Sequence, residues 1–198
     1  ARDGTIPQLR NLSGDNTLTG THTWNTGGGS YRVQSDAGKL TIPGAINPLG
    51  GNKTLFIQGT GNTELSGAIA NTANAGTVLT LSKNGPGTLT LSNPASTYTG
   101  STRVLGGTLI VTNLANAGLP SSIGAAADFS FHILLDGGTL RHDAANTTST
   151  NRKFAIGLNS GAIDSSAADP AHTFNFTTNL AMGFNSLDGE RTLTLTGS

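Results

Sequence analysis

A five-residue phrase that recurs along the chain sets the strongest constraint on its fold. In its clearest copy a glycine is followed by alternating threonine and leucine, Gly-Thr-Leu-Thr-Leu, at residues 87–91. Further copies, some of them looser, stand at residues 38–42, 53–57, 77–81, 107–111, 138–142 and 191–195. Alternation places the apolar residues of most copies on one face of a β-strand and the intervening residues on the other. Each copy therefore predicts a short strand that buries about two apolar side chains.

The repetition of such strands favours stacking over a self-contained core. A unit with so few inward residues must pack on its neighbours. An antiparallel β-sandwich is the alternative. The same residue types at the same positions, with Asn and Thr beside the strands, favour a parallel β-solenoid, where like side chains form columns and ladders. With roughly 20–25 residues per coil, residues 1–198 would form one solenoid segment of about nine coils, some 40 Å long.

The spacing of the phrase is uneven, which predicts one surface loop. The interval from Thr108 to Thr139 is half as long again as the interval from Thr88 to Thr108. The extra residues are expected within 113–128.

The few aromatic residues are expected to pack rather than to bind. Two pairs with strand-like spacing are predicted to lie in the core: Phe129 with Phe131, and Phe174 with Phe176. Trp24 and Tyr31 are the candidates for an exposed aromatic row that could stack on sugars, but core or turn packing is favoured for both.

The composition excludes several classes of partner and site. Gly, Thr, Asn and Ser make up close to half of the chain, while charged residues are 11% and the net charge is zero. Without a run of Lys or Arg, neither nucleic acid nor an anionic membrane is an expected partner. The absence of Cys removes disulfides, thiolate catalysis and Cys-based metal sites. No stretch is long and apolar enough to predict insertion into a membrane.

The ionisable residues do not form a recognisable catalytic or metal-binding motif. The nearest approach to a metal site is His142 with Asp143, preceded by Asp136, and these are expected to be solvated loop and strand-edge residues. Adjacent coils could bring Asp136, Asp143, Arg141 and Asp164 together, as in polysaccharide-processing β-helix enzymes. Acidic residues are sparse and no Asp-x-Asp cluster occurs. The sequence therefore predicts no enzyme activity, no catalytic residue, no metal and no cofactor.

Residues 78–111 carry a resemblance to a known family. They run from Val78-Leu79-Thr80-Leu81 through Gly87-Thr88-Leu89-Thr90-Leu91 and Tyr98-Thr99-Gly100 to Gly107-Thr108-Leu109. This resembles the passenger-associated transport repeat of bacterial autotransporters, whose pattern is LTK-G-GTLTLSG-NTYTG-T-V-GTL. The departures, Asn93-Pro94 and Ser96, fall in a turn. Tyr98, in the TYTG element, is predicted to be a buried structural plug.

Weaker resemblance extends over most of the chain. Segments similar to such surface proteins stand at residues 11–20, 136–140, 151–154, 161–164 and 191–198. The resemblance implies a right-handed parallel β-helix, export across the outer membrane of a Gram-negative bacterium, and a role in adhesion or as a stalk.

Three functions remain open on the sequence. The leading one is a structural or adhesive passenger segment whose partner would be a host cell, a neighbouring cell or a glycan. The second is a fibre subunit that stacks end to end, because both ends lie in strand-like sequence without a polar cap. A fragment of a longer solenoid is the favoured explanation of those ends. The third is a polysaccharide-processing enzyme.

Overall fold

The copies of the glycine-led phrase lie side by side as parallel strands. In a computed structural model, which describes residues 6–24, 28–71, 74–143, 145–166, 171–178, 182–184 and 188–197, Leu89 is the register partner of Leu109, and Leu109 that of Leu140. Equivalent residues of successive copies therefore lie at equivalent positions on neighbouring strands, as a parallel solenoid requires.

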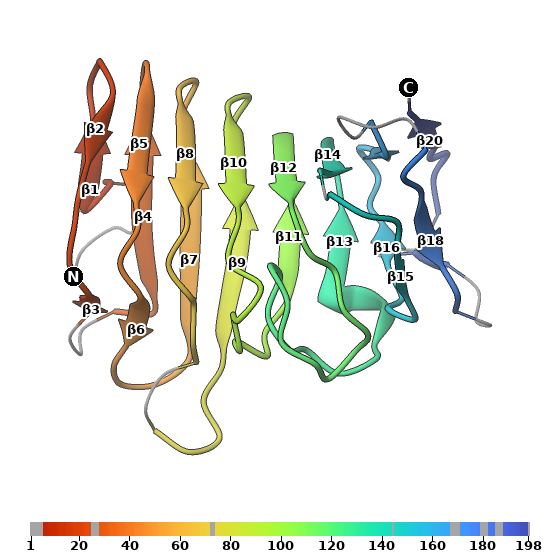
Figure 1. Cartoon of the computed structure of the whole chain (residues 1–198), viewed down its shortest axis with the longest axis horizontal. Helices are drawn as coiled ribbons and strands as arrows, with labels where there is room; N and C mark the ends of the chain where they lie inside the picture. The colour runs from red at the N-terminus through yellow and green to blue at the C-terminus, as the bar shows by residue number, and fades with distance from the viewer. Residues whose placement is uncertain are drawn as a thin grey trace.

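Two sheets of eight parallel strands run the length of the molecule (Figure 1). Sheet A contains β1 (Leu9–Asn11), β4 (Ser30–Ser35), β7 (Lys53–Gln58), β9 (Leu79–Lys83), β11 (Thr102–Val104), β13 (Ile133–Leu135), β16 (Ala155–Ile156) and β19 (Gly183–Phe184). Sheet B contains β2 (Asn16–Thr17), β5 (Lys39–Ile42), β8 (Asn62–Leu65), β10 (Thr88–Leu91), β12 (Gly107–Val111), β14 (Gly138–His142), β17 (Gly161–Asp164) and β20 (Leu193–Thr196).

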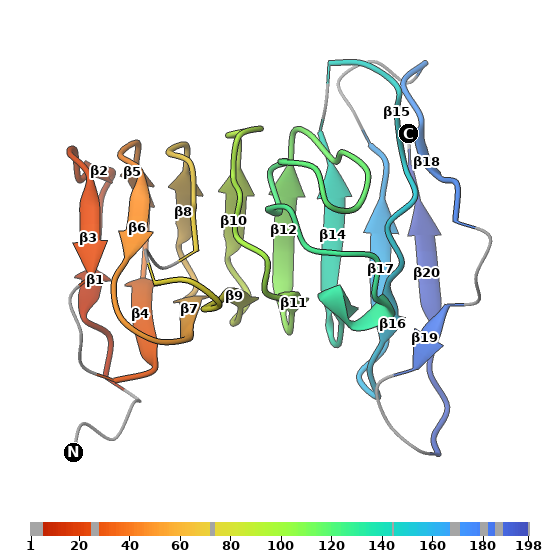
Figure 2. The ribbon, with the colours of Figure 1, turned by 90° about the horizontal axis from the view of Figure 1, so that it is seen from below.

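The third side of each coil is less regular. Among the described residues it forms strand pairs only at the two ends of the stack, β3 (His22–Trp24) with β6 (Ile46–Pro48) and β15 (Thr148–Thr150) with β18 (Phe174–Phe176). Between them this side consists of turns and loops, as seen from below in Figure 2. The fold is therefore an all-β parallel solenoid, which confirms the predicted class.

The number of coils is smaller than expected. Eight strands per sheet correspond to about seven full turns instead of nine coils. The reason is coil length, because some coils are longer than the roughly 20–25 residues expected for each. Two of these lead from Val104 to its register partner Leu135 and from Ala162 to its register partner Thr194.

The core consists of apolar columns contributed by the two sheets. On sheet B, Leu89, Leu109 and Leu140 stack directly and are almost fully buried. Each buried Leu contributes about 2 kcal/mol through removal of its surface from water. Tyr98, fully buried on the third side, is the plug that the sequence predicted.

Glycines line the corner between the sheets because coils approach closely there. Gly107 has a φ of +62°, and a Cβ at this position would lie 2.3 Å from the carbonyl oxygen of Gly87 in the preceding coil. Neither the backbone angle nor the space admits another side chain easily.

In the described part of the chain, no helix is long and apolar enough to cross a membrane. The single 3-10 helix there, η1 (Ser130–His132), lies against strands of sheet A.

Candidate functional site

The interval between β12 and β13 holds a loop, residues 112–132, that leaves the regular path of the coil. It belongs to one of the longest coils, the one that leads from Val104 to Leu135. In Figure 1 it lies, in green, at the lower edge of the stack. The expected loop at 113–128 is therefore present, and η1 extends it.

A buried arginine from the following coil organises this loop. Arg152 is almost completely buried, and its guanidinium donates hydrogen bonds to loop acceptors: the carbonyl oxygens of Ala115 (2.8 Å), Asn116 (3.4 Å), Leu119 (2.9 Å) and Gly124 (2.9 Å), and the Ser121 hydroxyl (3.3 Å). Burial lowers the pKa of Arg152. A cation is stable in a buried position only where hydrogen-bond acceptors replace its lost hydration. The loop carbonyl groups do this for Arg152, and the arginine in turn fixes the backbone of the loop.

Side-chain amides add a second set of bonds between the loop and that coil. The Asn151 side-chain oxygen accepts from the Ala117 backbone NH at 2.8 Å, and the Asn116 side-chain oxygen accepts from the Asn151 backbone NH at 2.9 Å. The Thr150 hydroxyl donates to the carbonyl oxygen of Ala115 at 3.0 Å. The loop is thus tied to its scaffold at several points.

Tyr98 supports the loop from the preceding coil. Its carbonyl oxygen accepts a hydrogen bond of 2.8 Å from the Ala125 backbone NH, and its hydroxyl lies 2.7 Å from the Thr102 hydroxyl. A Cβ on Gly124 would come within 2.2 Å of the Tyr98 carbonyl oxygen, so the contact requires glycine. Burial raises the pKa of Tyr98, so the phenol stays neutral.

The loop exposes three large apolar side chains, which we call the Phe129 patch. Leu119 is 53% exposed, Phe129 64% and Phe131 48%. In the same loop the Gly118 backbone NH donates to the Ala126 carbonyl oxygen, and the Phe129 backbone NH donates to the Ala127 carbonyl oxygen.

The prediction that Phe129 and Phe131 lie in the core is wrong. Their alternating spacing suggested a strand, but the strand begins at Ile133 and the preceding residues form η1. The helix lies on the outer side of sheet A, where Ser130 contacts Gly183 closely enough to exclude a Cβ there. The aromatic rings are left exposed to solvent.

The residues considered for a metal site are not brought together. Asp136 precedes β14 and accepts hydrogen bonds from the backbone and side chain of Asn159, whereas Asp143 follows β14. His142 is buried, contrary to the solvated position expected, with its Nε2 2.7 Å from the Thr148 hydroxyl and its ring stacked on Phe174. Within the described ranges no group of three or more His, Asp or Glu residues could hold a metal ion.

The residues considered for a polysaccharide-processing site are only partly neighbours. Arg141 and Asp164 are register partners on adjacent strands of sheet B. Asp136 and Asp143 stand at opposite ends of β14, so the three carboxylates do not converge on one point.

The two aromatic residues considered for sugar binding stack on each other. The rings of Trp24 and Tyr31 are 4.3 Å apart with an interplanar angle of 26°, and both pack against the core. This agrees with the packing role that the sequence favoured.

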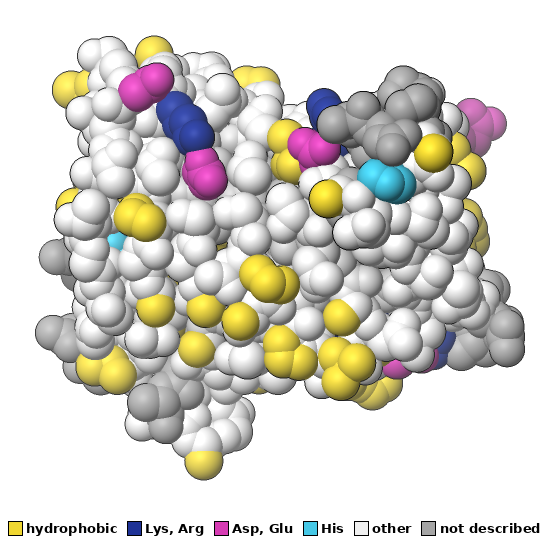
Figure 3. Space-filling view, viewed as in Figure 1, with side chains coloured by type: hydrophobic (Ala, Val, Ile, Leu, Met, Phe, Trp, Pro, Cys, Tyr) yellow, Lys and Arg dark blue, Asp and Glu magenta, His cyan; other side chains and the backbone are white. Residues whose placement is uncertain are grey.

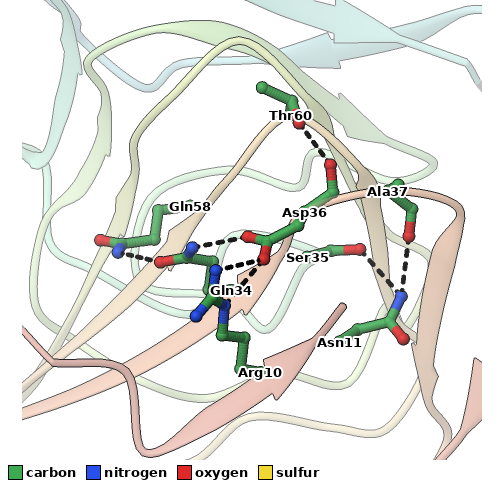
Figure 4. A network of polar contacts seen from close by, with 8 residues as sticks. All are labelled: Arg10, Asn11, Gln34, Ser35, Asp36, Ala37, Gln58 and Thr60. Carbon is green, nitrogen blue, oxygen red and sulfur yellow. Dashed lines mark hydrogen bonds and ion pairs between the residues drawn. The ribbon is translucent and has the colours of Figure 1, made fainter. Parts of the chain in front are cut away.

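Polar side chains on the first coils are largely engaged with one another (Figure 4). Asp36 accepts hydrogen bonds from Gln34 (2.6 Å) and Arg10 (2.7 Å), which lower the pKa of its carboxyl group. Gln58 donates to Gln34 at 2.8 Å, and Asn11 donates to Ser35 at 3.1 Å. All of these bonds except the one between Gln34 and Asp36 cross from coil to coil and act as side-chain ladders.

Comparisons with known proteins relate the chain to bacterial autotransporters. Residues 81–111, within the stretch that resembles the family, match the Passenger-associated-transport-repeat family. The chain is 33% identical over 184 residues to part of the "Adhesin BmaC autotransporter" of Brucella suis biovar 1 (strain 1330). The aligned region covers 92% of this chain and 5% of the relative. No solved structure matches the chain. The chain therefore carries a repeat of autotransporter passengers and is similar to an autotransporter adhesin along most of its length.

Proposed function

We propose that this chain is a non-enzymatic, adhesive segment of a secreted bacterial surface protein, displayed outside a Gram-negative cell. The observation that carries the proposal is the similarity to an autotransporter adhesin over 92% of the chain. The chain spans only about 5% of the relative's length, so adhesion and surface display are transferred here as a proposal.

The solenoid supports this function mechanically. Adjacent coils are joined by parallel strands in both sheets and by the apolar columns between them. Bending such a rod requires many backbone hydrogen bonds to deform together, so a loop on its side keeps a fixed position relative to the axis. The loop at 112–132, held by the buried Arg152 of the next coil, is suited to presenting contact residues at a distance from the cell.

A non-enzymatic role is supported by the similarity to an adhesin and by the distance between Asp136 and Asp143. The carboxylates of Asp136 and Asp143 are separated by the length of β14. Hydrolysis by paired carboxylates requires the two groups to be roughly 5–10 Å apart on either side of one bond. Adhesion needs no such pair.

The proposal is tested by displaying residues 1–198 on a non-adherent Gram-negative strain through a membrane anchor. We expect displaying cells to adhere to cultured epithelial cells several-fold more than cells that display an unrelated β-solenoid of similar length. Display levels are matched by antibody labelling of an epitope tag. Equal adherence of the two strains would refute an adhesive role for this segment. Release of reducing sugars from polysaccharides by the purified chain would refute the non-enzymatic part.

A further inference from the structure

The corner between β9 and β10 contains Asn84 and Gly85, the single Asn-Gly pair of the chain. Asparagine loses its side-chain amide most readily before a glycine, because glycine places no side chain beside the backbone nitrogen that attacks the amide. The pattern of the passenger repeat specifies the lysine before this pair and its glycine, but not the position of Asn84. The pair is therefore a feature of this chain and not of the repeat pattern.

We propose that Asn84 is a self-modification site, at which the Gly85 backbone nitrogen attacks the side-chain amide and converts the asparagine into aspartate or isoaspartate. The reaction consumes water and releases ammonia. This inference concerns the chemistry of the corner and is independent of the proposed adhesion.

The nucleophile is a backbone N–H group that the fold leaves available. The Gly85 N–H makes no hydrogen bond to any residue that the structure describes, whereas the N–H groups of Asn84 and Gly87 donate to Ile57 and Gly59 of the preceding coil. The peptide bond is trans, so the Gly85 N–H points away from the Asn84 carbonyl oxygen. Gly85 is partly exposed, and water can therefore accept its proton.

Lys83 stabilises the nucleophile in its deprotonated form. Its buried ammonium group donates to the Asn84 carbonyl oxygen at 3.1 Å. When the Gly85 N–H loses its proton, the negative charge is shared between the nitrogen and this oxygen, because both belong to one peptide group. A cation held beside the oxygen lowers the energy of that anion, and it does so most strongly away from bulk water.

Ser82 activates the group that is attacked. Its buried hydroxyl donates to the side-chain oxygen of Asn84 at 2.7 Å. This hydrogen bond polarises the amide carbonyl and strengthens as the oxygen gains negative charge in the tetrahedral intermediate. Three neighbouring residues thus act on the two reacting groups: Ser82 on the amide, and Lys83 and Gly85 on the nucleophile.

The reaction proceeds through a cyclic succinimide. The Gly85 nitrogen forms a bond to Asn84 Cγ, and the bond from Cγ to the side-chain nitrogen breaks after that nitrogen has taken a proton from water, so ammonia leaves. Water then opens the ring at one of its two carbonyl groups. Cleavage of the new bond gives aspartate, and cleavage of the original peptide bond gives isoaspartate.

Other asparagine side chains hold the coils together, whereas Asn84 does not. The side-chain oxygens of Asn52, Asn62 and Asn71 accept hydrogen bonds from backbone N–H groups of the following coil. The side-chain oxygen of Asn84 is bonded within its own coil, and its side-chain nitrogen donates to no residue in the described part of the chain. Loss of this amide therefore leaves the bonds between coils intact.

The modification would add charge to a part of the surface that carries little. The corners between the sheets lie along the upper edge of the molecule in Figure 1. On the face shown in Figure 3, the described charged side chains near that edge form a group on the left and a group on the right, with mostly uncharged groups between them. A carboxylate at position 84 would also give the neutral chain a net negative charge.

The experiment follows the Asn84 peptide by mass spectrometry while the purified chain is kept at about 37 °C and pH 7. The same chain in urea gives the rate of the Asn-Gly sequence without the fold. We expect the folded chain to lose the amide at least as fast as the unfolded chain. Ser82→Ala and Lys83→Met should each lower the folded rate at least about threefold and leave the rate in urea unchanged. Thr80→Ala, on the same face of β9 as Ser82, is the matched control and should keep the wild-type rate.

Two results would overturn the proposal. The first is slower loss of the amide in the folded chain than in urea, because the fold would then protect Asn84. The second is an equal folded rate in the wild type and Ser82→Ala, which circular dichroism must show to be folded. This second comparison decides the matter even where Lys83→Met does not fold. Neither result bears on the display experiment that tests adhesion.

Discussion

The guanidinium of Arg152 and the carbonyl oxygen of Gly124 are joined by a hydrogen bond of 2.9 Å that spans 28 residues of sequence. This bond links the coil of β16 to the irregular loop of the coil before it. The loop conformation is thus determined by a residue that lies outside the loop.

Replacing this arginine tests how the loop is held. Arg152→Met removes the donor for several buried carbonyl oxygens, so we expect a loss of about 3 kcal/mol in the free energy of unfolding. Arg152→Lys keeps the charge and part of the bonding, and should lose less. Urea denaturation measures both, and hydrogen exchange should show faster opening at residues 115–125. Unchanged exchange in Arg152→Met would contradict the assigned role.

The apolar column of sheet B is tested at Leu89. Leu89→Asp places an unpaired charge between Thr63 and Leu109, so we expect at least about 4 kcal/mol of destabilisation. Thr90→Asn, on the opposite face of the same strand, should change stability by less than about 1 kcal/mol. Similar melting temperatures for the two variants would show that the inward and outward faces are wrongly assigned.

The corner between the sheets is tested at Gly107. Gly107→Ala combines a left-handed backbone angle with a Cβ 2.3 Å from the oxygen of Gly87, so we expect a loss of about 3 kcal/mol. Gly51→Ala is the matched control, because a Cβ there meets nothing within 4 Å. Thermal denaturation of both variants gives the comparison. A neutral Gly107→Ala would mean that adjacent coils can separate at this corner without cost.

The buried position of Lys83 leads us to expect an increase in stability at alkaline pH. Lys83 lies in an otherwise apolar column of sheet A, between its register partners Ile57 and Val104. Its ammonium group donates to the carbonyl oxygens of Gly85 (2.8 Å) and Gly106 (3.1 Å). Burial lowers its pKa to about 8. Above that pH the unfolded chain binds the proton more tightly than the folded chain, so stability should rise by about 2 kcal/mol between pH 8 and pH 10.

The matched variant for this measurement is Lys83→Met. Its free energy of unfolding should lack the rise between pH 8 and pH 10 in urea titrations. Above pH 10 the buried phenol of Tyr98 should destabilise both proteins, because its pKa is raised in the folded state. A rise of the same size in Lys83→Met would assign the effect to another group.

His142 predicts a loss of stability in mild acid. Burial lowers its pKa, although the neighbouring Asp143 opposes the shift, so the folded state binds a proton less readily than the unfolded chain does. Stability should therefore fall as the pH decreases below about 6.5. His142→Gln should show a smaller decrease between pH 6.5 and pH 5, measured by thermal denaturation. An identical pH dependence in both proteins would exclude His142 as its source.

The strands that carry the recurring phrase were predictable because they follow from local alternation. Leu89 and its equivalents were placed correctly, and so was Tyr98, through its resemblance to a repeat. Phe129 and Phe131 were placed wrongly because such a short alternation does not distinguish a strand from the end of a loop. Lys83 gave no signal of burial, since a lysine after an alternating run is usually the solvated end of a strand.

The loop scaffold could not be predicted for a different reason. Arg152 reaches acceptors up to 37 residues away, and most of its partners are backbone carbonyl groups, which leave no trace in the residue types. Local periodicity carries no information about such contacts. The sequence indicated that extra residues were present, but not that they form a supported surface.

The coil that carries the loop is half as long again as the coil before it, yet the strands on either side keep their register in both sheets. Insertions on the third side are therefore absorbed without shifting the columns of the core. Natural selection can lengthen, shorten or exchange such a segment while the rest of the rod folds as before. The surface loop and the core columns can thus evolve at different rates within one short stretch of chain.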